Sequence, residues 1–366
     1  MNILWVANLP SPYRVDFFNE IGKSIKLTVL FERHNALNRE ENWFNKEFEN
    51  FNSVFLKKIN IGNEMSLSLD FLKYIDKKYD LIIISNYSSP VGVLMIEVLK
   101  LKKIRFGIVA DGGFVKQEHK LKYLLKKHLI HSASFWLSSG MPTNDYLTHY
   151  GAKEGSIYQY PFTSIKKKNI LERPLSVEEK KIYKKKLAIK EENMILSIGQ
   201  FIHRKGFDLL IEAAESVPEN TGIYVIGGNI TKEYSDLIEK LNLKNIYFLD
   251  FKSNVELEDF YKASDVFVLP TREDIWGLVI NEAMAFGLPV ITTNKCIAGV
   301  ELIKENKGGY IVSPNHEELS SRINKLVINE EQKNRMAQNN LDVIKNYTIE
   351  NMAKKHLDIF SNLNNR

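Results

Sequence analysis

The sequence contains a single cysteine, Cys296, in 366 residues, so an internal disulfide framework is impossible. So little cysteine suits a reducing compartment such as the cytoplasm. No apolar run approaches the roughly 18 residues that a membrane-spanning helix requires. The chain opens on the strand-like run 3–7, without the basic region and cleavage site of a signal peptide. These absences predict a cytoplasmic protein.

Several motifs of metal and nucleotide sites are also missing. There is no His-Glu-x-x-His, no cysteine pair and no Asp-x-Asp cluster of the kind that holds a divalent ion. There is no Walker motif and no Gly-x-Gly-x-x-Gly turn, so kinases and dehydrogenases have no support. Aromatic residues do not alternate with the lysines as in a stacking platform for nucleic acid, so we expect no nucleic-acid partner.

The composition is that of a globular protein, with 44% hydrophobic and 26% charged residues. A chain of this length can form two domains of ordinary size. Strand-like apolar runs alternate with helix-like segments, which predicts parallel sheets covered by helices. The expected strands are residues 3–7, 25–31, 81–84, 104–109, 134–137 and 157–160, then 194–198, 222–226, 245–249, 265–269, 289–292 and 309–312.

The stretch 266–292, VFVLPTREDIWGLVINEAMAFGLPVIT, contains the clearest candidate site. It predicts a buried strand, a polar loop with Glu273 and Asp274, and a helix that starts after Gly277. Ligands of open α/β sheets bind at such strand ends. A helix amino terminus suits phosphate, and acids accept hydrogen bonds from sugar hydroxyls. The pattern therefore favours a nucleotide sugar.

At these residues the sequence resembles the retaining glycosyltransferases of family 4. Their signature is an acid, seven residues and then Glu-Ala, with a Gly-Leu pair inside and a Gly-x-Pro after it. Asp274 stands where the family usually has its first Glu, and Glu282 is the second acid. Gly277 and Leu278 form the inner pair, and residues 287–289 complete the pattern.

The resemblance implies an α/β protein of the GT-B fold, with two Rossmann-like domains facing each other across a cleft. We predict an amino-terminal domain over residues 1–165 and a donor domain over 191–348. The lysine-rich segment 166–190 is expected to be a linker with a solvated helix. In such enzymes the last helix, here about 349–366, usually crosses back onto the first domain.

The resemblance also implies roles for residues of the donor site. Asp274 would orient the sugar, and Glu282 would hold the ribose hydroxyls. The N–H groups near Leu278 and Val279 would bind the diphosphate. Two further donor-site candidates are Glu273, beside the first acid, and Glu301, where the family often carries a sugar-facing Glu. Such enzymes usually need no metal, and the nucleotide sugar is a substrate, so we expect no cofactor.

The segment 199–213, GQFIHRKGFDLLIEA, follows the first strand of the second domain and places Arg204 and Lys205 at the start of a helix. Cations are disfavoured there unless an anion binds. Both are therefore candidates to neutralise a diphosphate as the sugar leaves. The family commonly has an Arg directly after the first glycine. Gly199 is present, but Gln200 occupies the Arg position, and Arg204 would substitute for it.

Acceptor-side candidates come from the first domain. Tyr13 and Arg14 lie in the loop NLPSPYR, residues 8–14, which two prolines stiffen; a plain turn is the alternative. Asp111, in ADGGF after the strand 104–109, is a candidate acceptor-binding residue or weak base.

Residues 1–170 carry 24 Lys and Arg against 16 Asp and Glu, a net charge of +8, whereas the remainder carries 26 against 29, or −3. The predicted helix Lys120–His131 combines four leucines on one face with lysines elsewhere. Such a helix can lie on an anionic membrane at the inner face. More often it buries its leucines in its own domain. The sequence leaves both readings open.

We therefore expect a hexosyltransferase that uses a nucleotide sugar, with UDP as the favoured carrier, and retains anomeric configuration. The acceptor would be a hydroxyl of a glycan or lipid-linked glycan in capsule, lipopolysaccharide or exopolysaccharide assembly, the usual employment of such relatives. One alternative is an epimerase or phosphorylase of the same fold. The other is a catalytically silent protein that binds nucleotide sugars, which Gln200 and Asp274 keep open.

Overall fold

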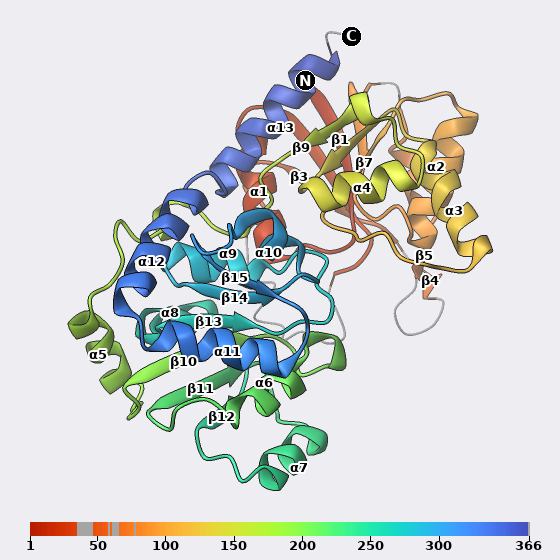
Figure 1. Ribbon diagram of the computed structural model, residues 1–366. Coiled ribbons are helices and arrows are strands. Elements are labelled where there is room, and N and C mark those ends of the chain that lie inside the picture. The colour runs from red at the N-terminus through yellow and green to blue at the C-terminus, as the bar shows by residue number, and fades with distance from the viewer. Residues whose placement is uncertain (35–46, 58, 61–65, 77, 365–366) are drawn as a thin grey trace. The chain divides into compact units, whose positions relative to one another are not determined.

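The computed structural model describes residues 1–34, 47–57, 59–60, 66–76 and 78–364. The chain divides into two compact units, Met1–Ser164 with Thr348–Arg366 and Ile165–Tyr347. Each unit is a parallel sheet with helices packed on it (Figure 1). We describe the units one at a time.

The described residues of the first unit form a seven-stranded parallel sheet in the order β3-β2-β1-β6-β7-β8-β9. Its strands are β1 (Asn2–Ala7), β2 (Lys26–Phe31), β3 (Asn52–Phe55), β6 (Leu81–Ile84), β7 (Gly107–Ala110), β8 (Phe135–Ser138) and β9 (Ile157–Gln159). Its helices are α1 (Pro12–Gly22), α2 (Pro90–Leu101), α3 (Lys120–His131), α4 (Met141–His149) and α13 (Ile349–Asn364). A short antiparallel hairpin pairs β4 (Ile59–Asn60) with β5 (Ser66–Leu67).

The strand order of this sheet reverses between β1 and β6. The chain runs from β1 outward through β2 and β3, and then returns to build the other half of the sheet from β6. Residues of β1 and β6 are almost entirely buried, as expected for strands with helices on both faces. The carboxyl ends of β1 and β6 are therefore the topological switch point, where ligands of open α/β sheets bind.

Helix α13 closes the first unit by packing on α1 (Figure 1). The ring of His356 lies 4.7 Å from that of Phe17 and 5.8 Å from that of Trp5. Burial lowers the pKa of His356 to about 4, so the imidazole stays neutral in this aromatic cluster. Packing of aromatic rings thus joins the last helix of the chain to the first strand and helix.

Residues 165–347, which are described throughout, form a six-stranded parallel sheet in the order β12-β11-β10-β13-β14-β15. The strands are β10 (Asn193–Ile198), β11 (Thr221–Ile226), β12 (Ile246–Leu249), β13 (Val266–Leu269), β14 (Val290–Thr293) and β15 (Gly309–Val312). The helices are α5 (Val177–Lys186), α6 (Phe207–Ala214), α7 (Lys232–Lys240), α8 (Asn254–Ala263), α9 (Leu278–Ala285), α10 (Ile297–Leu302), α11 (His316–Val327) and α12 (Glu330–Ile344). Here the order reverses between β10 and β13, so the loops after these two strands meet at the switch point.

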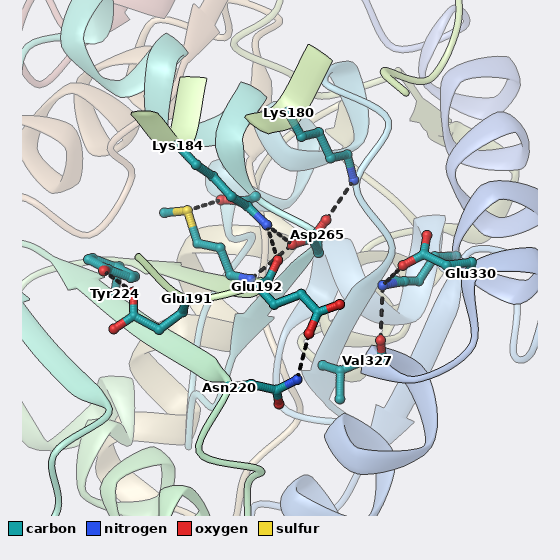
Figure 2. Close-up of polar contacts among 12 residues, drawn as sticks. Lys180, Lys184, Glu191, Glu192, Asn220, Tyr224, Asp265, Val327 and Glu330 are labelled. Carbon is teal, nitrogen blue, oxygen red and sulfur yellow. Dashed lines mark hydrogen bonds and ion pairs between the residues drawn. The ribbon is translucent and has the colours of Figure 1, made fainter. Parts of the chain in front are cut away.

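The segment 166–190, expected to be a linker with a solvated helix, lies in the second unit, and its helix α5 packs on α8. Figure 2 shows the polar contacts that hold it. Lys184 is only 7% exposed, and its Nζ lies 2.7 Å from Oδ2 of Asp265, directly before β13. Lys180 reaches the other oxygen of Asp265 at 3.2 Å. The expectation of solvation is therefore wrong for these two lysines, because a buried carboxylate holds them.

Candidate functional site

The loops after β10 and β13 are joined through the backbone of Arg204. Its carbonyl oxygen accepts hydrogen bonds from the N–H groups of Arg272 at 2.8 Å and Glu273 at 3.2 Å. Gly206 has a φ of +70°, and a Cβ at this position would lie 2.1 Å from the carbonyl oxygen of Pro270. Only glycine allows this close approach of the two loops.

Two predicted site residues meet across this junction. Nζ of Lys205 lies 2.5 Å from Oδ2 of Asp274, and the two residues are 9% and 7% exposed. The backbone of Asp274 is fixed as well, since its N–H donates to the carbonyl of Lys295 at 2.8 Å. A nearly buried cation paired with a side-chain anion thus lies at the switch point of the second sheet.

The remaining cations of these loops differ in their partners. Arg204 is exposed, and its Nη1 donates to the carbonyl oxygen of Glu273 at 3.2 Å. Arg272, which the sequence did not single out, binds Asp208 of α6 through two bonds of 2.7 and 2.5 Å. Burial opposes ionisation of Asp208, but these bonds lower its pKa overall. The Arg272–Asp208 pair therefore braces the loop, whereas Arg204 extends toward solvent.

Helix α9 begins beside the Lys205–Asp274 pair. Gly277, directly before the helix, has a φ of +96°, and a Cβ there would lie 2.6 Å from Sγ of Cys296. Leu278 and Val279 occupy the first turn. The first N–H groups of a helix lack acceptors within the helix, and together with the helix dipole they favour an anion. The sequence expectation of a helix start at Gly277 is met.

Glu282 lies in the second turn of α9, and its Oε2 accepts a hydrogen bond of 2.9 Å from the hydroxyl of Tyr261 on α8. Burial, with the charge of Glu282, raises the pKa of Tyr261 well above its usual value, so the hydroxyl keeps its proton. The sequence offered no signal for Tyr261, because a tyrosine on an amphipathic helix is commonly part of the core.

The other donor-side candidates occupy separate positions. Gly199 and Gln200 directly follow β10, with Gln200 exposed. Glu301 is half-buried on α10, and burial followed by the charge of Glu301 raises the pKa of Tyr347 to about 12. The two joined loops thus contain Gly199 and Glu273, and the start of α9 contains Leu278 and Val279. Glu301 instead lies near Tyr347, the last residue of the unit.

The acceptor-side candidates gather at the switch point of the first sheet. Arg14 forms an ion pair with Asp111, which follows β7. Nη1 of Arg14 also lies 3.4 Å from Oγ of Ser85, which follows β6. The hydroxyl of Tyr160 donates to Oδ1 of Asp111 at 2.7 Å. Burial would lower the pKa of Arg14, but Asp111 raises it overall, so the guanidinium remains charged. Tyr13 packs on Phe162 with ring centroids 5.6 Å apart.

This arrangement changes two expectations. Helix α1 begins at Pro12, so Tyr13 and Arg14 lie in its first turn and not in an extended loop. Proline is favoured at this position, because its missing N–H would have no partner there. Asp111 is a paired carboxylate held by Arg14 and Tyr160, which favours a positioning or binding role over that of a free base.

Helix α3 leaves most of its leucine face uncovered. Leu121, Leu124 and Leu125 are 72%, 47% and 54% exposed, and only Leu129, at 1%, is buried. Lys126 turns inward, with its Nζ 3.0 Å from Glu118. The reading in which α3 buries its leucines in its own domain is therefore wrong for three of the four.

Among the residues that the structure describes, no group of three or more His, Cys, Asp and Glu side chains is placed to hold a metal ion. The same residues contain no helix with both the length and the apolar character needed to cross a bilayer.

The two parallel α/β units place the protein in the GT-B class, as comparison with solved structures supports. Sucrose-phosphate synthase from Thermosynechococcus elongatus superimposes with a TM-score of 0.79 at 17% identity, over 99% of each chain. Anabaena Alr3699/HepE in complex with UDP gives a TM-score of 0.81 at 15% identity, over 99% of this chain and 100% of that one. These likenesses concern the fold alone.

A family model described as glycosyl transferases group 1 matches residues 179–342. This part of the chain, most of the second unit, is therefore similar to the group 1 glycosyl transferases, as its sequence pattern predicted. It contains Lys205, Asp274 and Glu282.

Curated relatives match over parts of their length. The lipopolysaccharide glucosyltransferase WaaG of Escherichia coli K12 is 34% identical over 141 residues, which is 37% of this chain and 37% of that protein. A Campylobacter jejuni N,N'-diacetylbacillosaminyl-diphospho-undecaprenol alpha-1,3-N-acetylgalactosaminyltransferase is 22% identical over 304 residues, 81% of this chain and 77% of that protein. For WaaG and three further relatives, the match spans half of the relative's length or less.

Proposed function

We propose that the protein is a retaining glycosyltransferase that moves a hexose from a UDP-sugar to a hydroxyl of a glycan or lipid-linked acceptor in surface-polysaccharide assembly. The observation that carries this proposal is the Lys205–Asp274 pair, which lies at the switch point of the second sheet beside the amino terminus of α9. Supporting it, the family match covers the same residues. The names of the relatives refer to lipopolysaccharide and to an undecaprenol-linked sugar, and HepE was solved with UDP.

The diphosphate of the donor would bind where positive potential converges. Lys205 supplies a compact charge, Arg204 an exposed guanidinium, and the first turn of α9 its N–H groups. Negative charge grows on the diphosphate as the bond to the sugar breaks. Donors already fixed around that charge stabilise the transition state more than the ground state.

The two acids would bind the rest of the donor. Asp274 accepts hydrogen bonds from sugar hydroxyls, and Glu282 from those of the ribose. As the family resemblance implies, the acceptor hydroxyl attacks from the face that the phosphate leaves, and a donor phosphate oxygen takes its proton. Asp274 also keeps Lys205 compensated while the site is empty, since a buried lysine without a partner is costly.

A thermal-shift panel of nucleoside diphosphates and their sugars, without added metal, tests the donor site. A ligand at 100 times its dissociation constant stabilises by about 2.7 kcal/mol, which raises the melting temperature by a few degrees. We expect UDP to stabilise the protein and one UDP-sugar to stabilise it further. A folded protein that responds to no nucleotide would contradict the proposal.

Transfer is tested with the sugar that the panel selects and an acceptor glycan, with the anomeric configuration of the product read by NMR. Lys205→Ala is expected to lower turnover about 100-fold, because one charged transition-state contact contributes about 2–3 kcal/mol. Lys232→Ala, at a side chain that is 91% exposed on α7, is the control. Activity that survives excess EDTA is also expected. Full activity of a folded Lys205→Ala enzyme would sink the assignment.

The same assay separates the alternatives. An epimerase would convert the donor without net release of nucleotide, and a phosphorylase would require inorganic phosphate. A silent nucleotide-sugar-binding protein would be stabilised by the donor yet release no UDP with any acceptor.

We further propose that α3 lies on the anionic inner face of a membrane, which would bring the enzyme to lipid-linked acceptors. Its exposed leucines form an apolar strip, since positions 121, 124 and 125 fall on one face of a helix. Lys120, Lys122 and Lys127 are exposed beside them. Apolar contact combined with charge complementarity is how an amphipathic helix binds anionic lipid.

Vesicle co-sedimentation tests this surface. We expect binding to vesicles of mixed phosphatidylglycerol and phosphatidylcholine, and none to phosphatidylcholine alone. Replacing Leu121 and Leu125 by Glu should abolish binding and leave UDP affinity unchanged. Ile328→Glu, at a residue that is 79% exposed in the second unit, is the matched control. Equal binding of the double variant would overturn the assignment.

A further inference from the structure

Tyr261 is fixed by its surroundings and directs its hydroxyl at a single carboxylate. It is 3% exposed on α8, and its ring stacks on Phe286 with centroids 5.0 Å apart and planes 4° from parallel. The ring centroid of Phe267 in β13 lies 6.1 Å from that of Tyr261. With the ring held in this way, the hydroxyl has one acceptor, Oε2 of Glu282 at 2.9 Å.

The contact partners are Glu282 in α9 and Phe286, the residue directly after that helix. Glu282 and Phe286 are four residues apart, so one aromatic side chain on α8 contacts both. A glutamate has three rotatable bonds, and fixing them costs conformational entropy when a ligand binds. A buried donor that already fixes the carboxylate reduces this cost, which is the advantage of preorganisation.

We propose that Tyr261 is a positioning residue that orients the carboxylate of Glu282 for recognition of the ribose of the nucleotide. This inference rests on the proposed donor function, and adds a residue that does not itself touch the nucleotide. An ionised carboxylate has about four lone-pair sites, so Glu282 can keep the bond from Tyr261 and accept ribose hydroxyls as well.

The second unit offers a matched control for removal of this hydroxyl. Tyr247, in β12, donates to Oε1 of Glu191 at 2.6 Å. That pair lies at the amino edge of the same sheet, because Glu191 precedes β10 and Tyr247 is the second residue of β12. Tyr247→Phe and Tyr261→Phe both delete a hydroxyl that donates to a glutamate, but only Tyr261 contacts a residue assigned to the donor.

The experiment compares dissociation constants of UDP with those of its 2′-deoxy and 3′-deoxy forms, by calorimetry, for the full-length wild type and its variants. A site that binds a hydroxyl rejects an analogue that lacks it. We expect the wild type to prefer UDP over at least one deoxy form. Tyr261→Phe should weaken the binding of UDP five- to tenfold and the binding of that deoxy form far less. The preference for UDP over the deoxy form should therefore become smaller. Tyr247→Phe should leave both constants unchanged.

Several results would overturn the proposal. If Tyr261→Phe keeps the wild-type preference while Glu282→Gln loses it, Glu282 recognises ribose without help from Tyr261. If Tyr261→Phe weakens UDP and its deoxy forms equally, the tyrosine supports only the local structure. If the folded wild type binds no nucleotide, the proposed donor function fails, and this inference fails with it.

Discussion

Two buried aspartates flank strand β13, one directly before it and one in the loop that follows it, and each binds lysine. Asp265 precedes the strand and Asp274 follows it, and each is 7% exposed. Asp265 binds Lys180 and Lys184 of α5 and accepts the N–H of Met194 at 2.9 Å (Figure 2). Asp274 binds Lys205. Burial and ion pairing alone therefore do not mark a functional site.

The difference between the two sites is their position in the sheet. Asp265 lies at the amino edge, where its lysines attach a helix of the same unit. Burial lowers the pKa of Lys180 in spite of Asp265, and the neighbouring charges of Lys333 and Lys184 contribute to this shift. Asp274 lies at the carboxyl edge, between two loops and next to a helix amino terminus. There the same kind of pair can exchange partners with a ligand.

The largest effect is expected when the amino-edge pair is broken. Asp265→Asn leaves the buried Lys184 and the half-buried Lys180 without this counter-charge and should destabilise the second unit by about 3–5 kcal/mol. Calorimetry of the wild type and variant at neutral pH measures the loss. The fraction that remains folded should bind UDP as the wild type does. Wild-type stability would mean that solvent reaches these lysines after all.

The pH dependence of this loss provides a second test. Burial would raise the pKa of Asp265, but Lys180 and Lys184 lower it overall. A carboxyl whose folded pKa is lowered contributes stability above its unfolded value of about 4, and loses it as pH falls through the folded value. The gap between wild type and Asp265→Asn should therefore shrink at acidic pH. A gap independent of pH would assign the effect to packing.

Breaking the carboxyl-edge pair should change turnover, which the amino-edge pair is not expected to affect directly. Asp274→Asn frees Lys205 for the diphosphate, so UDP affinity should be kept or increased, while loss of the sugar contact lowers turnover about 100-fold. Calorimetry with UDP and initial-rate assays with the donor measure the two effects. A variant that loses UDP binding and turnover together would show that Asp274 acts on the nucleotide and not on the sugar.

The sequence allowed the carboxyl edge to be predicted better than the amino edge. Apolar runs located the twelve expected strands to within about three residues but missed β3 and the short β4–β5 hairpin. The loops that carry Lys205 and Asp274 follow from strand ends in a parallel sheet. The attachment of α5 could not be inferred, because Lys180 and Asp265 are 85 residues apart. In a lysine-rich segment, composition does not reveal which side chains a buried acid will bind.

The same limit applies to single contacts. Spacing placed Leu121, Leu124 and Leu125 on one face of a helix, but only the tertiary structure reveals that nothing in the described chain covers them. Tyr160 and Tyr261 each donate to a predicted acid, yet neither lies in a motif. Such partners depend on how helices pack, which local patterns do not encode.

The smallest expected effect concerns a third buried acid, Glu32, which follows β2 in the first unit. No lysine is bonded to it in the described residues; it accepts from the hydroxyl of Ser89 at 2.8 Å and more weakly from Asn86. Burial raises the pKa of Glu32 to about 7, against a partial opposing effect of these bonds. Unlike Asp265, this acid is more stable when protonated.

Glu32→Gln should therefore stabilise the first unit at alkaline pH. A carboxyl whose folded pKa is raised costs stability as pH rises from its unfolded value, about 4.3, to its folded value. Glutamine keeps the size and an acceptor oxygen but removes the charge, so we expect a gain of about 1–3 kcal/mol at pH 8 that disappears near pH 4. Melting temperatures of both proteins at the two pH values measure it. A loss of stability at pH 8 would show that the ionised carboxylate of Glu32 stabilises the fold, as that of Asp265 does. A buried acid would then not need a bonded lysine to be more stable when ionised.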